Sequence, residues 1–597
     1  MTTTTASPTR RRNRALVAVA GLIAAAVAVA VVASLGSSDR EVSVFPDDST
    51  VAASPATTIT FRGANPGDLE NVRVTGSRSG DHEGRWREHP DGRGATFLPD
   101  RRFAPGELVT VDAGMRVAGT GERSSSFVVA RRNTFPDPPD DQAKEPVKQG
   151  VQNFASQPGL HPPAIQVDEA SGAAARGRVF VAPKRGATQQ GPMIIDSSGE
   201  LIWFDPLPGN DQAFDFRAQS YLGRPVLTWW QGRMQLYRGG GVGRIVDTHY
   251  RPVATVRAAN GYQMDAHELT LTPAGTALII SYNTVPWDLT KLGGRRDGLV
   301  EDNVVQEIDV ETGAVLFEWH TLGAIPLGES YRPAPQERGK LHDAWHLNSV
   351  DVDRDGDFIV SARHDSAVYK IDRETGDVIW RLGGKENDFE MGRGAAFNLQ
   401  HDARVHPDGT ISLFDNVTED PKARDQQSRA ITLRLDEEKK TASLVHEFEH
   451  PDGVLSTTQG SNEPLEGGGA FVGWGGLNQQ FSEFDRDGNL VFDARFGVKG
   501  VETYRAYRMP WRARGQGRPK AAATAAGGAT AVKMSWNGST DVASWRVVPG
   551  GGGEPTTVPR DGFETAARLL GRPSSVVAEA LGARGKVIGT SERVPVR

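Results

Sequence analysis

The stretch Ile371-Asp372-Arg373-Glu374-Thr375-Gly376-Asp377-Val378-Ile379-Trp380 decides the fold, because its pattern is repeated along the middle of the chain. Each copy has an aspartate, a glycine three or four residues later, and then a run of mainly apolar residues. Aspartate caps a tight turn and glycine adopts the positive φ that such a turn needs, so each copy predicts two strands joined by a turn. The other copies are Ile195–Trp203, Ile308–Phe317 and Phe484–Phe492.

A second hairpin pattern alternates with the first one. Its copies are Thr272–Ile280, Asp353–Val360 and His406–Leu413. Two hairpins supply four strands, which is the number in one blade of a β-propeller. No helical periodicity of useful length interrupts them, which disfavours a parallel α/β fold. We therefore predict an all-β chain containing a six-bladed β-propeller, with units near residues 177–206, 212–255, 265–322, 343–384, 400–450 and 458–497.

Other β-rich segments flank the predicted propeller, which we place at residues 164–515. Residues 41–132 contain short alternating runs separated by Gly, Pro and Asp, and predict an Ig-like β-sandwich. Residues 520–597 predict a second, fibronectin-III-like sandwich. The stretch 133–163 is rich in Pro, Asp and Gln, so we expect a linker between the first sandwich and the propeller.

Residues 1–40 carry a targeting signal. Four arginines between residues 10 and 14 precede an uncharged apolar run at 15–33. A run of this length can span a bilayer as a helix. We predict a basic cytoplasmic tail and a single-pass transmembrane anchor in the cell membrane, with the bulk of the chain outside the cytoplasm. The alternative is a cleaved signal peptide, which would make the protein secreted.

The composition excludes several classes of function. The net charge of −7 comes from interspersed charges of both signs, so no basic stripe is offered to a nucleic acid. The 597 residues contain no cysteine, which excludes disulfides, thiolate nucleophiles and cysteine-ligated zinc sites. Any nucleophile must therefore be another kind of side chain.

Aligning the predicted blades by their turns places a histidine at nearly the same position in three successive units. These are His267, His346 and His401, each at the start of the first strand of its unit, which lines the channel of a propeller. Arg363 occupies an inward-facing position on a neighbouring strand. Burying these groups together costs free energy unless a ligand uses them, so we predict an anion-handling site.

Three histidines also suit a zinc ion, but Arg363 would place a fixed positive charge beside the metal. The fork of an arginine matches the oxygens of an oxyanion, so we predict neither a metal nor a cofactor. The stretch Asp351–Asp357 resembles the first half of a calcium loop. The glutamate that would close such a loop is missing, because residue 362 is alanine, so we predict a hairpin turn.

From about Phe154 to Arg512 the chain resembles the arylsulfotransferases, a family of six-bladed propellers. The matching stretches are Gln400-His401-Asp402-Ala403-Arg404, His346-Leu347-Asn348-Ser349, Ser361-Ala362-Arg363, His267 and the lead-in at residues 154–163. Members of the family move a sulfuryl group from a phenolic sulfate ester to another phenol through a sulfohistidine. The resemblance implies an aryl sulfate donor and a phenolic acceptor as partners, and no nucleotide sulfate donor.

The resemblance also assigns roles to residues. It implies that His401 is the nucleophile, that His267, His346 and Arg363 complete the catalytic set, and that Asn348 and Arg363 bind the substrate. Either Asp402 or Asp415 could orient His401. Two other functions stay open: a non-catalytic cell-surface propeller that binds anionic or sulfated ligands, and a quinone- or metal-dependent oxidoreductase. The oligomeric state is not predicted.

Overall fold

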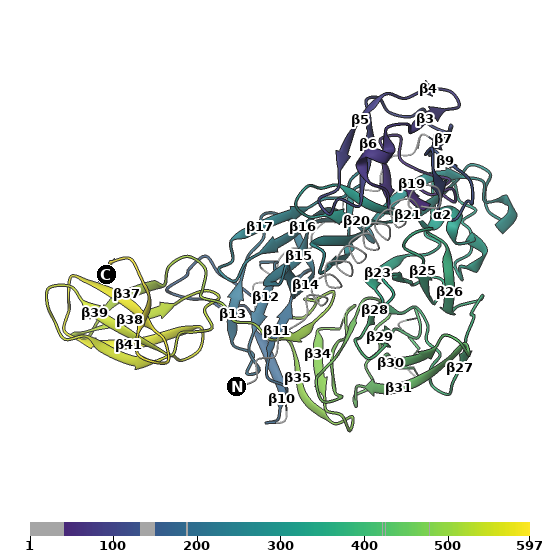
Figure 1. The fold of residues 1–597 in the computed structure, drawn as a ribbon. Helices are drawn as coiled ribbons and strands as arrows, with labels where there is room; N and C mark the ends of the chain where they lie inside the picture. Colours follow the sequence, from purple (N-terminus) through teal and green to yellow (C-terminus); the bar gives the residue numbers. More distant parts are fainter. Residues whose placement is uncertain are drawn as a thin grey trace, which may run out of the picture.

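The computed structural model describes residues 41–131 and 150–597, except residues 173, 187–188, 421, 424–425 and 477. The predicted anchor at 15–33 lies outside the described residues, as does much of the predicted linker. Within the described ranges no helix is long and apolar enough to cross a membrane. Strands dominate (Figure 1), and the predicted all-β class is confirmed. The helical turns are η1 (Pro66–Leu69), η2 (Thr290–Leu292), α2 (Thr321–Ala324) and η3 (Leu327–Glu329).

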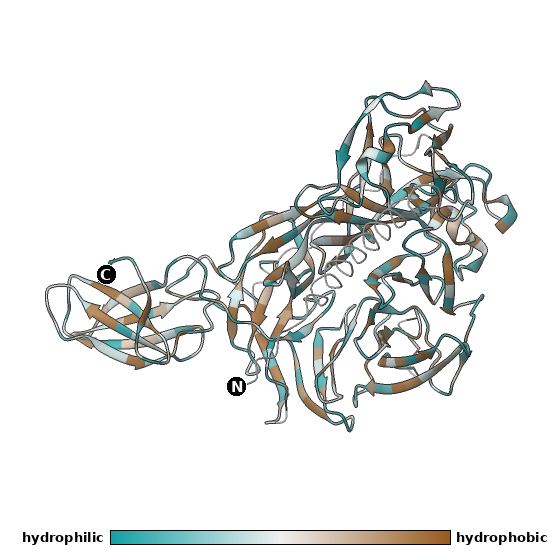
Figure 2. Ribbon diagram, in the orientation of Figure 1, coloured by the Kyte–Doolittle hydropathy of each residue, from teal (hydrophilic) through white to brown (hydrophobic). Residues whose placement is uncertain are grey.

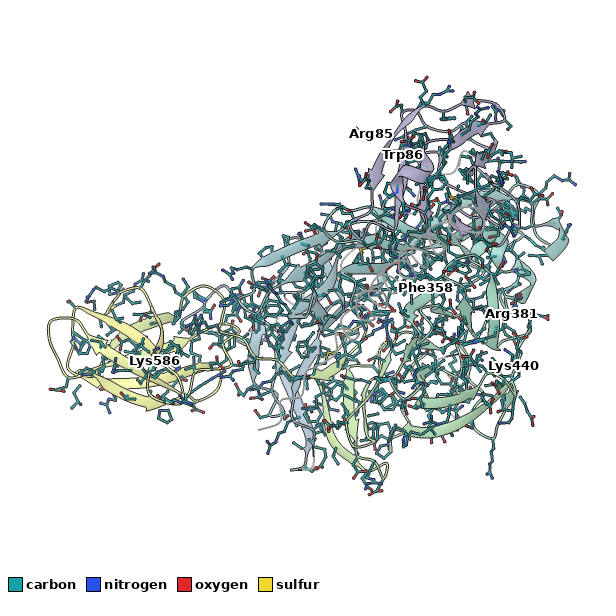
Figure 3. The ribbon with its side chains drawn as sticks, in the orientation of Figure 1. Arg85, Trp86, Phe358, Arg381, Lys440 and Lys586 are labelled. Carbon is teal, nitrogen blue, oxygen red and sulfur yellow. The ribbon has the colours of Figure 1, made fainter. Side chains whose placement is uncertain are left out.

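The first described segment forms two sheets that pack around one apolar core. β7 and β9 alternate buried residues with more exposed ones, so their sheet turns one face inward. The ring of Trp86, labelled in Figure 3, lies 5.4 Å from the ring of Phe61, which is in the same sheet. The sheet orders are β5 (Gly84–Glu88), β6 (Gly94–Pro99), β2 (Ile59–Arg62), β1 (Glu41–Phe45), β8 (Arg116–Val117), and β4 (Gly80–Asp81), β3 (Arg73–Gly76), β7 (Leu108–Asp112), β9 (Ser124–Val128).

The middle of the chain forms five sheets. The first two have the orders β10 (Ile165–Ala170), β35 (Leu490–Phe496), β34 (Gln480–Phe484), β33 (Ala470–Gly473), β32 (Ser461–Pro464), and β13 (Leu201–Phe204), β12 (Met193–Ile195), β11 (Arg178–Val181), β36 (Tyr507–Met509). The third has the order β14 (Gln212–Tyr221), β15 (Arg224–Gln235), β16 (Arg238–Val246), β18 (Met264–Leu271), β19 (Thr276–Trp287), β20 (Gly298–Asp309), β21 (Val315–His320). The last two have the orders β23 (Leu347–Val352), β24 (Phe358–Ala362), β25 (Ala367–Ile371), β26 (Val378–Gly383), and β27 (Glu390–Met391), β31 (Thr441–Glu449), β30 (Arg429–Asp436), β29 (Thr410–Asp415), β28 (His401–Val405). In the third sheet β17 (Pro252–Val256) also pairs with β16, and β22 (Leu341–His342) with β20.

The hairpins predicted from the two sequence patterns are confirmed. The first pattern forms β12–β13, β20–β21, β25–β26 and β34–β35, and the second forms β18–β19, β23–β24 and β28–β29. In the β25–β26 turn the Thr375 amide donates to Asp372 Oδ1 at 2.9 Å, and Gly376 has a φ of 81°. Aspartate and glycine thus have the roles in the turn that the repeat indicated.

Strands from the two ends of this region pair with strands far away in sequence. β10 pairs antiparallel with β35, and β36 pairs antiparallel with β11. The sheet of β11–β13 therefore includes the C-terminal strand β36, and the sheet of β32–β35 includes the N-terminal strand β10. Both ends of the region are held by main-chain hydrogen bonds, which leaves fewer exposed strand edges. Figure 2 shows that hydrophobic residues alternate with hydrophilic ones along many of these strands.

The N-terminal sandwich packs directly on the middle region. The rings of Phe45 and Phe317 lie 4.7 Å apart, and Thr60 Oγ1 donates to the Val315 carbonyl at 2.7 Å. Phe358, labelled in Figure 3, packs in turn against Phe317 at 4.6 Å. One buried apolar cluster therefore spans both parts.

The C-terminal part forms two more sheets and lies at one end of the molecule (yellow in Figure 1). Asn537 Nδ2 donates to the Phe204 carbonyl at 2.9 Å and Tyr250 Oη donates to the Gly538 carbonyl at 2.8 Å, so it contacts the middle region. The sheet orders are β37 (Lys520–Ala526), β38 (Ala529–Ser535), β41 (Glu564–Leu570), and β40 (Thr556–Pro559), β39 (Ser544–Pro549), β42 (Ser575–Leu581), β43 (Val587–Thr590), with β44 (Val594–Pro595) on β42.

Candidate active site

A cavity of about 850 Å³ is lined by residues from the ends of several middle sheets. His267, His346, Arg363 and His401 all line it, so four of the five predicted site residues come together in space. His267 lies on β18, His346 directly precedes β23, Arg363 directly follows β24 and His401 begins β28. The convergence follows from the repeat, because equivalent strand positions face the same space.

His401 is buried and has a defined tautomer. Its Nδ1 lies 2.7 Å from Asn416 Oδ1, and its Nε2 accepts a hydrogen bond from the Gln459 main-chain N–H at 3.1 Å. Nδ1 therefore carries the proton and Nε2 carries the lone pair. Burial, with the nearby positive charge of Arg363, lowers the pKa of His401 well below its usual value, which keeps the ring neutral.

Asn416 orients His401 because its own amide group is fixed. Asn416 Nδ2 donates to the Ser456 carbonyl at 2.8 Å and to the Gln459 carbonyl at 3.0 Å. These two bonds leave Oδ1 to face the imidazole. The sequence left open whether Asp402 or Asp415 orients His401. In the structure neither of them bonds to the imidazole ring of His401.

His267 and His346 each bond to a carboxylate through Nδ1. His267 Nδ1 contacts Asp265 Oδ2, and His346 Nδ1 lies 2.6 Å from Asp343 Oδ2. The two imidazole rings lie 5.1 Å apart. Burial, and the nearby His267 and Arg363, lower the pKa of His346 well below its usual value. An aspartate two or three residues before each histidine is visible in the sequence and could have indicated these pairs.

Arg363 supplies a buried positive charge to the cavity. Its Nη1 lies 2.6 Å from Glu419 Oε1 and 2.7 Å from His364 Nε2, and its Nη2 donates to the Thr457 carbonyl at 2.8 Å. Burial lowers the pKa of His364 to about 2, so His364 accepts from Arg363 as a neutral ring. Neither His364 nor Glu419 was predicted as a site residue, and both line the cavity.

Asn348 does not line the cavity, in contrast to its predicted role in substrate binding. Its side chain is fully buried between β23 and β28. Nδ2 donates to the Gln400 carbonyl at 2.8 Å, and Oδ1 accepts from the Asp402 N–H at 3.3 Å. Because these bonds are made to the residues on either side of His401, Asn348 holds the main chain of the nucleophile candidate.

One wall of the cavity is apolar and aromatic. Phe214, Tyr504 and three residues of the β15–β16 hairpin, Met234, Leu236 and Tyr237, line it. Leu236 is 51% exposed and has a φ of 59°, a conformation that is unfavourable for leucine. An exposed leucine held in this way beside an aromatic wall suits the ring of an aryl ligand.

Below the histidines lies a network of buried charges. The side chain of Arg505 is inaccessible to solvent, and its Nη1 lies 2.8 Å from Asp215 Oδ1 while its Nε lies 3.4 Å from Asp402 Oδ1. Arg404 bridges Asp402 and Glu268, each at 2.8 Å. Glu268 and Asp402 directly follow His267 and His401 in sequence. The network therefore joins the strands that carry two of the site histidines.

Two groups of side chains have the composition of a metal site. Asp343, His346 and His364 lie close enough to share an ion. The Nδ1 atoms of both histidines already make hydrogen bonds within the protein. Nδ1 of His346 contacts Asp343 Oδ2, and Nδ1 of His364 lies 2.7 Å from the Asp343 carbonyl. The second group is Asp353, Asp355 and Asp357 in the predicted hairpin turn.

The ammonium group of Lys370 occupies the centre of that second group. Lys370 Nζ lies 2.7 Å from Asp353 Oδ2, 2.8 Å from Asp355 Oδ2 and 3.7 Å from Asp357 Oδ2. A side chain of β25 therefore offsets part of the negative charge of the acidic turn. This agrees with the interpretation of the stretch as a β23–β24 turn rather than as a calcium loop.

Residues 217–497 match the family model described as Arylsulfotransferase (ASST). The family resemblance seen in the sequence is confirmed over this part of the chain. The matched segment is just under half of the protein and contains His267, His346, Arg363 and His401. No curated protein matches the chain.

Solved structures resemble this arylsulfotransferase-like chain only weakly. A protein of unknown function from Bacteroides caccae has 14% identity and a TM-score of 0.35, covering 56% of this chain and 99% of its own. A catalytically inactive virginiamycin B lyase from Staphylococcus aureus, solved with quinupristin, has 10% identity and a TM-score of 0.31, covering 62% of this chain and 96% of its own. Such low scores say nothing about the activity of this chain.

Proposed function

We propose that this protein transfers a sulfuryl group from a phenolic sulfate ester to a phenolic acceptor through a sulfohistidine at His401. The observation that carries the proposal is the tautomer of His401, because Asn416 holds the proton on Nδ1 and leaves the Nε2 lone pair in a cavity with a buried arginine. A neutral imidazole is the nucleophilic form. The N–H of Gln459 marks the position where an electrophilic sulfur would approach Nε2.

In the first step His401 Nε2 forms a bond to sulfur while the bond between sulfur and the phenolic oxygen breaks. The phenoxide leaves and takes a proton from His267, whose Nδ1 contacts Asp265 Oδ2. Arg363 balances the charge on the sulfuryl oxygens. In the second step the oxygen of an acceptor phenol attacks sulfur, His267 takes its proton, and His401 is released as the neutral ring.

The other residues of the cavity have supporting roles in this scheme. His346, with its lowered pKa, remains a neutral ring in the same cavity as His401. Tyr237, Leu236 and the rest of the aromatic wall hold the ring of the donor or acceptor. The chemistry uses only side chains of this chain and needs no nucleotide sulfate donor.

The proposal is tested by trapping the intermediate. The full-length protein is mixed with 4-nitrophenyl sulfate without an acceptor, and nitrophenol release and intact mass are followed. We expect one sulfuryl adduct per chain, mapped to His401 by peptide sequencing, and its loss when phenol is added. Turnover without any adduct would argue for direct transfer. Saturable binding without turnover would favour the non-catalytic, anion-binding propeller instead.

The pH dependence gives a second test. Protonation of His401 removes the lone pair, and its pKa lies well below the ordinary value of 6.5 because of burial and Arg363. We expect kcat/KM for 4-nitrophenyl sulfate to be constant down through pH 6.5 and to fall only at more acidic pH. This donor is chosen because its leaving group needs little protonation. An acid-side decline centred at or above the ordinary value would contradict the assignment of His401.

We also propose that the five sheets of the middle region form a six-bladed propeller. The nine-stranded sheet counts as two blades, β14–β17 and β18–β21, because only Gly241 and Met264 pair between β16 and β18. The other four sheets supply one blade each, and β10 and β36 complete the last and first blades.

We also propose that the apolar run at 15–33 anchors the protein in the membrane, or directs its secretion, so that sulfuryl transfer takes place outside the cytoplasm.

A further inference from the structure

Two arginines converge on one carboxylate oxygen at the edge of the cavity. Arg332 Nη2 and Arg363 Nη1 each lie 2.6 Å from Glu419 Oε1. Arg332 lies between η3 and β22, Arg363 follows β24, and Glu419 lies between β29 and β30. Three separate segments of the chain thus place two positive charges and one negative charge at a single point.

His364 fixes the geometry of this point. Its Nδ1 lies 2.7 Å from the Asp343 carbonyl, so Nδ1 carries the proton and Nε2 accepts. Nε2 lies 2.7 Å from Arg363 Nη1 and 3.3 Å from Arg332 Nη2. The two guanidinium groups are therefore turned toward each other by a neutral acceptor, although like charges repel. An anion between them is required to offset that repulsion.

Glu419 is less buried than Arg363, one of the two arginines that it contacts, while the other one, Arg332, is 44% exposed. The side chain of Glu419 is 32% exposed, whereas that of Arg363 is 5% exposed. Within the described residues, its carboxylate contacts Arg332, Arg363 and His364. Only Oε1 takes part in them. A group with three acceptor oxygens would satisfy the two guanidinium groups better than this one carboxylate oxygen.

We propose that Arg332 and Arg363 form a clamp for the sulfuryl group of the donor, and that Glu419 occupies this clamp until the donor displaces it. Arg332 is then a substrate-binding residue, and Glu419 sets the affinity by competing with the substrate. The assignment rests on the proposed function for the identity of the anion. The class of ligand is a tetrahedral oxyanion ester, with inorganic sulfate as the free form of the same chemistry.

The clamp lies between two cavities. A second cavity of about 550 Å³ shares Arg332, His364 and Glu419 with the first one, and Phe397 and Tyr331 also line it. Displacement of Glu419 would remove the carboxylate from the boundary that both cavities share. A donor whose sulfuryl group is held by the clamp would then have room on either side for its aryl part.

The test measures binding by calorimetry in a His401→Ala background, in which the proposed transfer cannot occur. The probes are 4-nitrophenyl sulfate, inorganic sulfate and, as the uncharged analogue, 4-nitrophenol. Glu419→Gln keeps the shape and the acceptor oxygen but removes the charge, so we expect about tenfold tighter binding of 4-nitrophenyl sulfate. Arg332→Gln should weaken binding about tenfold. Binding of 4-nitrophenol should not respond to either change.

The two substitutions should also be coupled. Glu419→Gln should increase affinity less when Arg332 is already glutamine, because the two residues act at one point. Glu466→Gln and Arg486→Gln, at exposed turns of the β32–β35 sheet, are the matched controls and should change nothing. Unchanged or weaker binding of 4-nitrophenyl sulfate to the Glu419→Gln variant would overturn the proposal. The proposal would also be overturned if the substitutions changed the affinity for inorganic sulfate only.

The clamp and the proposed function can fail separately. The binding measurements need no turnover. The absence of an adduct in the wild-type protein would therefore contradict the proposed transfer reaction, while calorimetry would still test the clamp. If an adduct forms on His401 but Glu419→Gln does not change the affinity for 4-nitrophenyl sulfate, only the proposal of the clamp is contradicted. Circular dichroism and melting temperature of each variant show that it is folded, so that a loss of affinity is not a loss of structure.

Discussion

Replacing His401 with alanine is expected to lower turnover of 4-nitrophenyl sulfate by at least about ten-thousand-fold and to abolish the sulfuryl adduct. The reason is that the bond to sulfur forms at Nε2, and no other group of the cavity is oriented by the same contacts. Asn416 and the Gln459 N–H define both ring nitrogens of His401. Steady-state release of nitrophenol and intact mass measure the two effects.

His406→Ala is the matched control for this substitution. His406 lies in the β28–β29 turn, where Nε2 contacts Ser412 Oγ at 2.8 Å, and it does not line the cavity. Its replacement should leave the rate within about twofold of the wild type. His267→Ala should have an intermediate effect that grows as the leaving phenol becomes more basic. A His401→Ala variant that keeps a tenth of the wild-type rate would exclude His401 as the nucleophile.

The repeat made much of this arrangement predictable. Aspartate–glycine turns recur with local spacing, so the hairpins could be identified without knowledge of the fold. Because the hairpins share one register, His267, His346 and His401 could be expected to meet, and they line one cavity. Arg363 was predictable for the same reason, since it follows β24 at an inward position. Local periodicity carries this information because each strand alternates its faces.

Other parts of the site depend on contacts between distant segments. Asn416 was visible as a polar residue after β29, but its role depends on two carbonyl groups beyond β31 that fix its amide. Asn348 is of a residue type that often binds substrates, yet its side chain bonds to the main chain next to His401. The pairing of β10 with β35 likewise joins residues with no shared local pattern. Such contacts are decided by tertiary packing, which a single sequence does not display.

The packing of the charges beneath the histidines explains how the site is held. On β18 and β28 a histidine is followed directly by a carboxylate, Glu268 or Asp402, and both carboxylates pair with Arg404. The histidine of each pair lines the cavity. Arg505 also donates from Nη2 to the Asn348 carbonyl at 2.7 Å, which ties β23 into the same network. The positions of the three site histidines are thus coupled through one buried set of charges.

Replacing Arg505 with methionine is therefore expected to lower the free energy of unfolding by about 3–5 kcal/mol. The substitution leaves Asp215 and Asp402 buried with fewer positive partners, and the cost of an uncompensated buried charge exceeds the net contribution of an intact pair. Urea denaturation followed by tryptophan fluorescence measures the change. Arg486→Met, at an exposed turn, is the control and should stay within about 0.5 kcal/mol of the wild type.

A second substitution separates charge from packing. Asp215→Asn in the Arg505→Met background removes one of the unpaired carboxylates, so it should restore part of the lost stability, whereas Asp215→Asn alone should destabilise the protein. If the double variant is as unstable as the sum of the two single variants, Arg505 acts by filling space and not by balancing charge. If it is partly restored, the network is electrostatic, and the residual activity of the double variant reports how closely the histidines depend on it.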